Sequence, residues 1–477
     1  MKKTKRLTKI SRKTSRRFLS ITLIRLLPCL LAGLLIVLLT TMLAACGKQD
    51  VLDPRNPVTV TLWHPYVQQM KNSIELLIEE FNETEGKDKG IYVQTAYIAD
   101  SPDISEKLIE AVSGDPGAPE LPDIAIIYPR IGTTLAGMDM LTDFSVYFTP
   151  EELASFVPAF LEEGKLGSDT LYILPFAKST EVLFLNTTVY ARFSADTGVS
   201  LDQLRTFEGV LDAAAKYYEW SGGKSFLHIV DLFNCAMTGY RQIGETFITE
   251  ESINLAASAF PKIWDLYYPR AVQGGVAIYD SYADFLMATG EIICGINTSA
   301  SVSYFSETVT FADNTKEDLN LTILPYPIVE GGEKTVLQRG AGLSVIKSDP
   351  QREYAACLFI KWLTEPAQNL RFSAQTGYMP ATVAAFEEFL TLDASLVSNP
   401  NVMKLFTTIE LMQREYSFYY PPVFDGFEDI QKNYNQSLRK ASENARMEYL
   451  SLLDTFDPTT AYEFVSEGIM ERFIDAW

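Results

Sequence analysis

The sequence predicts an α/β fold in two lobes with a helical C-terminal region, and three observations support this. The chain has 477 residues, more than a single hydrophobic core usually organises. Stretches with strand-like alternation and stretches with helical periodicity follow one another, which is typical of sheets covered by helices. Two extended apolar segments, 172–186 and 292–301, interrupt this order and are interpreted as connections between the lobes.

The first 45 residues have the pattern of an export signal. They hold ten Lys and Arg and no acidic residue, and a basic stretch is followed by a long apolar run. The uncharged run from Leu26 to Cys46 is long enough to cross a bilayer, so a permanent membrane span is the alternative. The run ends in Leu-Ala-Ala-Cys-Gly, which resembles the bacterial lipobox and favours cleavage before Cys46.

The resemblance to a lipobox implies that 1–45 is a lipoprotein signal peptide and that Cys46 is acylated. Residues 46–57 are polar and contain two prolines, so they are expected to tether the lipid anchor to the folded body. The protein is therefore expected to be exported and anchored to the cell membrane, facing the periplasm or the extracellular side.

The start of the body reads as strand, helix, strand, helix, strand. Residues 58–64 alternate like a strand, and Met70, Ile74, Leu77, Ile78 and Phe81 then recur at helical spacing. A second strand (91–98), a second helix (105–112) and a buried-type strand (121–129) follow. This order predicts right-handed crossovers and a parallel sheet.

The rest of the chain continues the pattern. Asn186, followed by two threonines, is expected to cap a helix, and Asp457 before Pro458 is expected to begin another. The remaining expected elements are a helix at 201–220, a strand at 290–299, strands at 321–328 and 340–347 around a Gly-Gly turn, and a helix at 349–377 broken near Pro366.

Charge and composition exclude several classes of function. Beyond the leader, 30 Lys and Arg face 61 Asp and Glu, a net charge of -31, which disfavours a nucleic-acid partner. The two histidines, His64 and His228, are too few for a multi-histidine metal site, and no cofactor or metal is expected. The three cysteines of the body either stay free in the core or form one bridge: they are Cys235, Cys294 and Cys357.

Three short stretches are candidate ligand contacts. Trp63 and His64 end the first strand and belong either to the core or to a stacking platform for a sugar. Thr298 and Ser299 begin a run of small hydroxyl residues that either satisfies its own loop or binds a polar ligand. The sequence "TGYMP" places Tyr378 between Gly377 and Pro380, which fixes an aromatic ring between two helices.

Seven stretches together, in this order and spacing, resemble the extracellular solute-binding proteins of ABC importers, carbohydrate type, and among them the glycerol 3-phosphate binders. They are "LWHPYVQQMKNSIELLIEEFNE", "LPDIAIIYPRIGTT", "LPFAKSTEVLFLNTTVYA", "GEIICGINTSAS", "LTILPYPI", "GAGLSVIK" and "FIKWLTEPAQNLRFSAQTGYMPAT".

The resemblance implies a periplasmic-binding-protein-like fold of type II, in which two lobes close about a hinge on a small polar solute. On this basis the N-lobe is expected to comprise 58–176 plus 300–340, and the C-lobe 180–296 plus 346–477. The resemblance also implies a monomer that binds a sugar or a sugar or glycerol phosphate without chemistry and then docks on the transmembrane subunits of a permease.

Carried over residue by residue, the resemblance places Ser179, Thr298, Ser299, Gly340 and Tyr378 at the ligand. Three cations, Arg130, Lys178 and Arg339, fall beside cleft positions, and they suggest an anionic ligand unless they pair with carboxylates. The predicted function is therefore a solute-binding lipoprotein and not an enzyme. The alternatives are a lipid-anchored glycan hydrolase with paired carboxylates, and a structural lipoprotein without a solute site.

Overall fold

The computed structural model describes residues 52–97, 101–114, 116–249, 252–389, 391–392, 397, 399–424 and 426–477. The expected signal peptide and the acylated Cys46 lie outside the described residues. Within the described residues, no helix is long and apolar enough to span a membrane. Residues 57–477 form one compact unit that contains two separate large sheets.

The first sheet defines the N-lobe. Its five strands, in spatial order, are β2 (Ile91–Tyr97), β1 (Val58–His64), β3 (Ile124–Ile127), β14 (Gly342–Val345) and β4 (Leu174–Pro175). The pairs β1–β2 and β1–β3 are parallel, as the strand–helix–strand order predicted, whereas β14 runs antiparallel to both β3 and β4.

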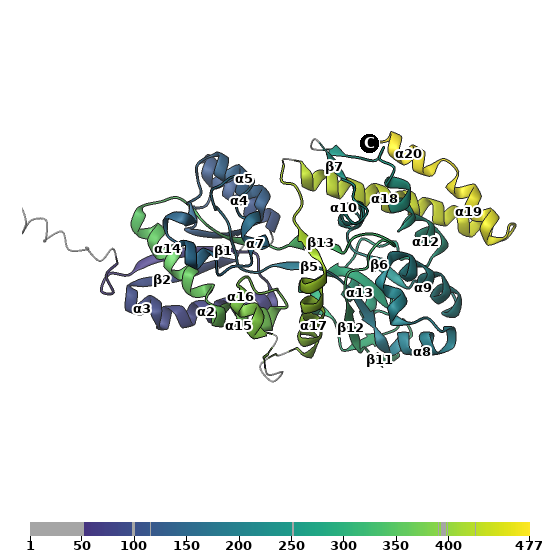
Figure 1. Ribbon diagram of the computed structural model, residues 1–477, viewed down its shortest axis with the longest axis horizontal. Coiled ribbons are helices and arrows are strands. Elements are labelled where there is room, and N and C mark those ends of the chain that lie inside the picture. The colour runs from purple at the N-terminus through teal and green to yellow at the C-terminus, as the bar shows by residue number, and fades with distance from the viewer. Residues whose placement is uncertain are drawn as a thin grey trace, which may run out of the picture. The chain divides into compact units, whose positions relative to one another are not determined.

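Helices cover both faces of this sheet, as Figure 1 shows, with α4 and α5 on one face and α2 and α14 on the other. One core contains Trp63 and Ala125 of the sheet together with Leu108 of α4 and Leu135 of α5. The N-lobe helices are α2 (Gln68–Glu83), α3 (Glu85–Lys89), α4 (Ser101–Ser113), α5 (Pro129–Gly137), α6 (Pro150–Leu153), α7 (Pro158–Glu163), α14 (Pro350–Leu363), α15 (Pro366–Thr376) and α16 (Val383–Phe389), with the 3₁₀ turn η1 (Phe144–Val146).

The second sheet defines the C-lobe. Its strands are β15 (Ser417–Tyr419), β13 (Thr335–Arg339), β5 (Ser179–Asn186), β9 (Cys294–Thr298) and β6 (Leu227–Ile229) in spatial order, with β12 (Leu321–Leu324) also paired to β5. All eight residues of β5 are buried, because neighbours cover both its faces and both its edges. Two further strand pairs are β7 (Ile248–Thr249) with β8 (Ser252–Ile253), and β10 (Thr308–Thr310) with β11 (Lys316–Asp318).

Helices of the C-lobe account for most of the remaining chain. Asn186 accepts hydrogen bonds from the backbone of Thr188 and Val189, and Asp457 caps α19 in the same way, so both predicted helix starts are confirmed. The helices are α8 (Thr187–Thr197), α9 (Phe207–Trp220), α10 (Leu232–Gln242), α11 (Phe260–Asp265), α12 (Tyr268–Gln273), α13 (Ala283–Ala288), α17 (Pro400–Glu415), α18 (Phe427–Leu452), α19 (Pro458–Ser466) and α20 (Ile469–Asp475), with the 3₁₀ turns η2 (Leu201–Arg205) and η3 (Ser299–Tyr304).

The strand pairings correct the expected division of the chain between the lobes. Residues 300–340, expected in the N-lobe, supply β12 and β13, which pair with β5 of the C-lobe sheet. The segment from 346, expected in the C-lobe, begins with Ile346 in the N-lobe core, and α14 and α15 then pack on β1 and α2. The two strands expected around one Gly-Gly turn, β12 and β14, therefore belong to different sheets, with β13 between them in sequence.

Two short connections between the sheets lie side by side, and a third, longer passage leads from β14 through α14–α17 to β15. The first is 176–178, between β4 and β5, as the broken extended segment predicted. The second is Gly340, between β13 and β14, and not the expected 292–301, since β9 is an inner strand of the C-lobe sheet. A Cβ atom at Gly340 would overlap the carbonyl oxygen of Ala177, so the two connections touch there.

Candidate functional site

A cavity of about 280 Å³ lies beside these two connections, and both lobes line it. The N-lobe contributes Tyr128–Arg130 at the start of α5, and Glu163 at the end of α7. The C-lobe and the second connection contribute Asn234 of α10, residues 337–340, the segment 421–424 ahead of α18, and Phe427, Glu428 and Gln431 of α18.

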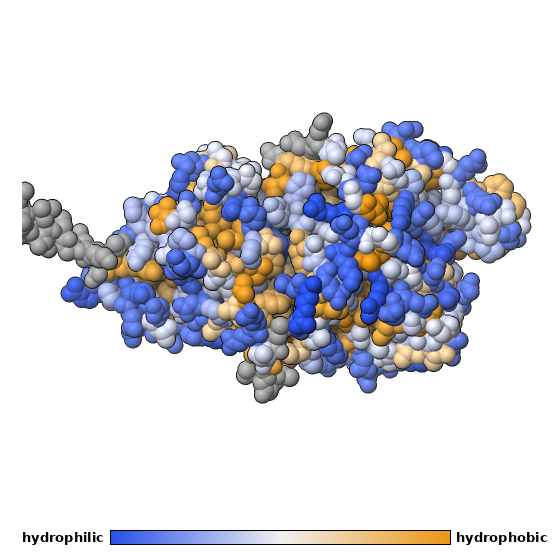
Figure 2. All heavy atoms as spheres, in the orientation of Figure 1, coloured by the Kyte–Doolittle hydropathy of each residue, from blue (hydrophilic) through white to orange (hydrophobic). Residues whose placement is uncertain are grey.

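The segment that leads into α18 forms an apolar part of the wall. Val423, Phe424 and Phe427 are half-buried, and Phe427 packs edge-to-face on Phe233 of α10 with ring centroids 5.4 Å apart. On the face drawn in Figure 2, hydrophobic residues gather where β15 leads into α18. The cavity therefore combines apolar rings with polar groups, as ligand sites usually do.

Each of the three cations expected at the cleft forms an ion pair with a carboxylate. Arg130 of α5 pairs with Glu428 of α18 at 2.9 Å. Lys178 forms a buried pair with Glu163 and also donates to the carbonyl oxygen of Gly340 at 3.0 Å. Arg339 pairs with Glu181, and together the three ion pairs leave this cluster formally neutral.

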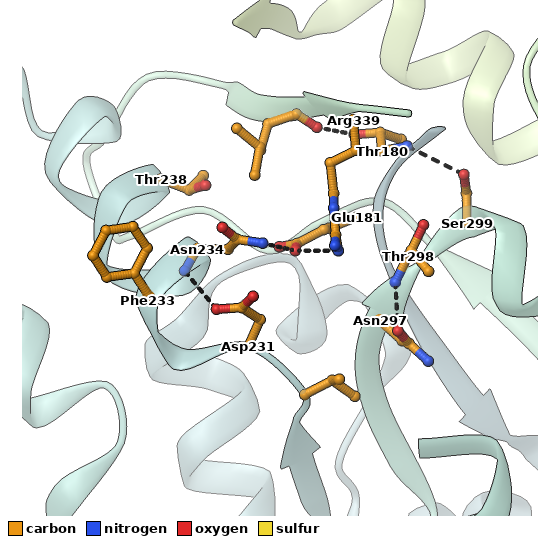
Figure 3. Close-up of polar contacts among 12 residues, drawn as sticks. Thr180, Glu181, Asp231, Phe233, Asn234, Thr238, Asn297, Thr298, Ser299 and Arg339 are labelled. Carbon is orange, nitrogen blue, oxygen red and sulfur yellow. Dashed lines mark hydrogen bonds and ion pairs between the residues drawn. The ribbon is translucent and has the colours of Figure 1, made fainter. Parts of the chain in front are cut away.

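The third pair joins Arg339 of β13 to Glu181 of β5 at 3.3 Å. Figure 3 shows the side chains of Arg339 and Asn234 converging on Glu181, and the Asn234 amide donates to it at 3.0 Å. Burial raises the pKa of Glu181 to about 7, and nearby Asp231 raises it further, while Arg339 and Asn234 oppose the rise. Glu181 is thus a buried acid that titrates near neutral pH.

Four tyrosines lie close together beside the cavity: Tyr128, which lines it, and Tyr66, Tyr304 and Tyr378. The Tyr378 ring stacks on Phe372 and lies 6.2 Å from the ring of Tyr66, which follows β1. Burial raises the pKa of Tyr378, and the next causes are the neighbouring hydroxyls of Tyr128 and Tyr304. Gly377 ends α15 in a left-handed conformation (φ +82°), which turns the chain so that Tyr378 joins this group.

The polar candidates from the sequence occupy different environments. Thr298 is half-buried at the end of β9, where Figure 3 draws it with Ser299 and Thr180. Ser299 is buried and its hydroxyl accepts a hydrogen bond from the Thr180 backbone at 3.2 Å. Ser179 is buried in β5, and Gly340 lines the cavity.

Trp63 and His64, both candidates from the sequence, do not line the cavity. Trp63 is buried in the N-lobe core. His64 is fully buried, its Nδ1 accepts from the Tyr66 backbone at 3.2 Å, and its ring stacks on Tyr66. Burial lowers the pKa of His64 to about 4, so the imidazole is neutral and positions the Tyr66 loop.

Several residues at the cavity were not among the sequence candidates: Tyr128, Asn234 and the start of α18 line it. Tyr66 and Glu181 lie next to lining residues, and Tyr304 lies next to Tyr378. One signal was available for Glu181, because it is a single carboxylate in an otherwise apolar strand, "STEVLFLN". An isolated charge at such a position is costly unless it is paired.

No group of three or more His, Cys, Asp or Glu side chains that could hold a metal ion occurs within the described part of the chain. Cys235, Cys294 and Cys357 are buried and free. They therefore act as small apolar core residues.

A two-lobed α/β fold with a ligand-sized cavity between the lobes defines a solute-binding protein of the periplasmic type. The family model described as "Bacterial extracellular solute-binding protein" matches residues 77–404. The chain belongs to this family, and the sequence resemblance is confirmed.

Two curated relatives are the sn-glycerol-3-phosphate-binding periplasmic proteins UgpB of Agrobacterium fabrum and Rhizobium meliloti. Each is 24% identical over 355 residues, which cover 68% of this chain and 74% and 76% of the relatives. The family and these relatives are binding proteins, and they give no support to the hydrolase alternative.

Solved structures of similar fold include two proteins that bind different ligands. The cyclic α-maltosyl-1,6-maltose binding protein from Arthrobacter globiformis gives a TM-score of 0.64 at 16% identity, covering 87% of this chain and 100% of that one. UgpB from Mycobacterium tuberculosis in complex with glycerophosphocholine gives a TM-score of 0.62 at 16% identity, covering 88% of this chain and 99% of that one. At this identity the likeness shows the fold, so the predicted type of fold is confirmed.

Proposed function

We propose that this protein is the lipid-anchored receptor of an ABC importer. It captures a small polar solute, a carbohydrate or a glycerol-phosphate-like compound, between its lobes and delivers it to a membrane permease as a monomer. The observation that carries this proposal is the cavity that both lobes line, where hydrogen-bonding groups meet the rings of Tyr128, Phe424 and Phe427.

The charge balance of the cavity favours an uncharged solute over a phosphate. Among the described residues, the cations Arg130, Lys178 and Arg339 are each neutralised by a carboxylate. A phosphate would have to replace one of these carboxylates, which would then lie unpaired at the site. Sugar hydroxyls, in contrast, accept from a paired guanidinium, and the C–H face of a sugar ring packs on an aromatic ring such as Tyr128, without disturbing the pairs.

Anchoring rests on the lipobox-like sequence around Cys46, and on the polar residues after it that separate an anchor from the body. Acylation at Cys46 would keep the receptor close to its permease. Replacing Cys46 by Ser is expected to abolish acylation, measured by intact mass and by release of the protein from the membrane fraction. Retention of lipid by this variant would contradict the anchor.

A thermal-shift and calorimetric screen tests the binding function. Maltose, maltotriose, sn-glycerol 3-phosphate and glycerophosphocholine are added to the mature chain, and a bound solute is expected to raise the melting temperature. Tyr378→Ala is expected to weaken binding by about 2 kcal/mol, because it removes a ring that lies beside the cavity.

Tyr92→Ala is the matched control, because Tyr92 is an exposed tyrosine on β2 that does not line the cavity. It is expected to bind as the wild type does. The proposal fails if the screen yields no ligand in either chemical class, or if Tyr378→Ala binds as tightly as Tyr92→Ala. Added salt separates the classes, since screening weakens binding of an anion and leaves a neutral sugar unaffected.

A further inference from the structure

Glu181 is a buried carboxylate behind the cavity that holds two of its lining residues, Asn234 and Arg339, and the proposed function does not yet use it. Glu181 is 2% exposed on β5, three residues after the first connection between the lobes. Its Oε1 accepts from the amide of Asn234 and from a guanidinium nitrogen of Arg339 (Figure 3). These two contacts come from α10 and β13, so Glu181 ties two elements of the C-lobe together at the cavity.

Arg339 is the part of this arrangement that reaches the ligand space. It lines the cavity, and its side chain keeps 36% of its surface exposed although Glu181 is almost fully buried. Tyr128 and Tyr378 are close enough to influence it electrostatically. A guanidinium has five N–H donors, and the contact with Glu181 engages one of its nitrogens, Nη1.

We propose that Glu181 is a positioning residue for solute binding, which holds the Arg339 guanidinium toward Tyr128 and Tyr378 only while the Glu181 carboxyl is ionised. This inference rests on the proposed function, because it assigns Arg339 as a donor to the bound solute. Fixing the long Arg339 side chain in advance lowers the entropy lost when a solute binds. Protonation of Glu181 removes the ion pair and releases that side chain.

The surroundings of Glu181 set the pH at which this happens. Burial dominates and raises its pKa to about 7, so its carboxyl gains a proton as the pH falls through neutral. Solute affinity should therefore be full at mildly alkaline pH and fall on acidification. The titratable and charged groups that face Glu181 are Arg339 of β13, Asp231 ahead of α10, Cys235 of α10, Tyr326 after β12 and Tyr419 of β15.

The test is a pH profile of binding by calorimetry, with maltotriose, an uncharged solute, as the probe. For the wild type, the dissociation constant is expected to rise up to about tenfold for each pH unit below about 7. Glu181→Gln keeps the amide contact to Asn234 but cannot ionise. It is expected to bind weakly at every pH, at the level of the acidic limb of the wild type. A Glu181→Gln profile that follows the wild type, or a flat wild-type profile, overturns the inference.

A measurement without solute separates this inference from the proposed function. Phenylglyoxal modifies accessible arginines, and Arg339 should react several-fold faster in Glu181→Gln than in the wild type at one fixed pH. The control is the Arg352–Asp123 ion pair, which lies outside the cavity and also joins a partly exposed arginine to a buried carboxylate. The modification rate of Arg352 should rise in Asp123→Asn and should equal the wild-type rate in Glu181→Gln.

If maltotriose does not bind, the proposed carbohydrate class fails, while the modification rates still decide whether Glu181 holds Arg339. An Arg339 rate that is the same in the wild type and in Glu181→Gln contradicts the positioning role, whatever the solute.

Discussion

Lys178 and Glu163 form the most buried ion pair of the cavity, and their burial decides what each contributes. Their side chains are 4% and 7% exposed, and each has one further partner, the Gly340 carbonyl for Lys178 and the Gln338 amide for Glu163. A buried pair of this kind adds little net stability, because desolvation offsets the attraction. Loss of one partner is different, since the other charge is then left without compensation.

We therefore expect Lys178→Met to lower the free energy of unfolding by about 3–5 kcal/mol. The double variant Lys178→Met/Glu163→Gln should lower the free energy of unfolding by less than the sum of the losses in the two single variants, because it leaves no buried charge. Urea denaturation of the four proteins measures this coupling. Strict additivity would mean that the two side chains do not interact.

Gly340 is a second residue whose role follows from local geometry. Its φ is +107°, and a Cβ atom would overlap the Ala177 carbonyl oxygen, so Gly340→Ala is expected to lower the free energy of unfolding by about 2–4 kcal/mol. Gly331 is the matched control: its φ is also positive (+76°), but no atom lies within 4 Å of its Cβ position.

Gly331→Ala should lower the free energy of unfolding by about 1–2 kcal/mol, because the positive φ alone disfavours alanine there. Equal losses for the two variants in urea denaturation would show that the close approach of the two connections does not constrain the chain.

At the scale of elements, local patterns predicted the helices and most strands, but not which strands pair. The capping residues Asn186 and Asp457 are short-range signals, and they were correct. β9 was read as a connection between the lobes because a buried inner strand and an extended connection are both short apolar runs. The pairing of β9 with β5 and β6 depends on contacts that are remote in sequence, which periodicity does not encode.

The contact between α5 and α18 makes a prediction at this scale. Arg130 and Glu428 are partly exposed, and their ion pair joins an N-lobe helix to a C-lobe helix across the cavity. Exposed pairs contribute about 0.2–1 kcal/mol, so Arg130→Glu and Glu428→Arg should each weaken solute binding by up to about fivefold at low salt.

The exchanged pair Arg130→Glu/Glu428→Arg should recover the affinity, because the attraction is restored with the charges reversed. Calorimetry at low and high salt measures this, and the differences should shrink as salt is added. An exchanged pair no better than the single variants would argue against a direct contact between the helices.

For the whole molecule, the sequence predicted two lobes and a cleft but assigned parts of the chain to the wrong lobe. Gly340, placed at the cleft by resemblance, lines the cavity, whereas Tyr378 lies beside it, close to the lining residues Tyr128 and Arg339. Glu181 and the start of α18 could not be placed, because their position depends on how β5 and the C-terminal helices pack together. Residues that act through a local motif were found, whereas residues brought together by the fold were missed.

The central claim is that a polar solute is held between two lobes that close on it about the connections at 176–178 and Gly340. Small-angle scattering of the mature protein, with and without a saturating solute found in the screen, tests this most directly. The account predicts a smaller radius of gyration for the wild type with solute, and a much smaller decrease for Tyr378→Ala at a concentration that only just saturates the wild type. A wild-type radius that stays constant while calorimetry records full occupancy would contradict it.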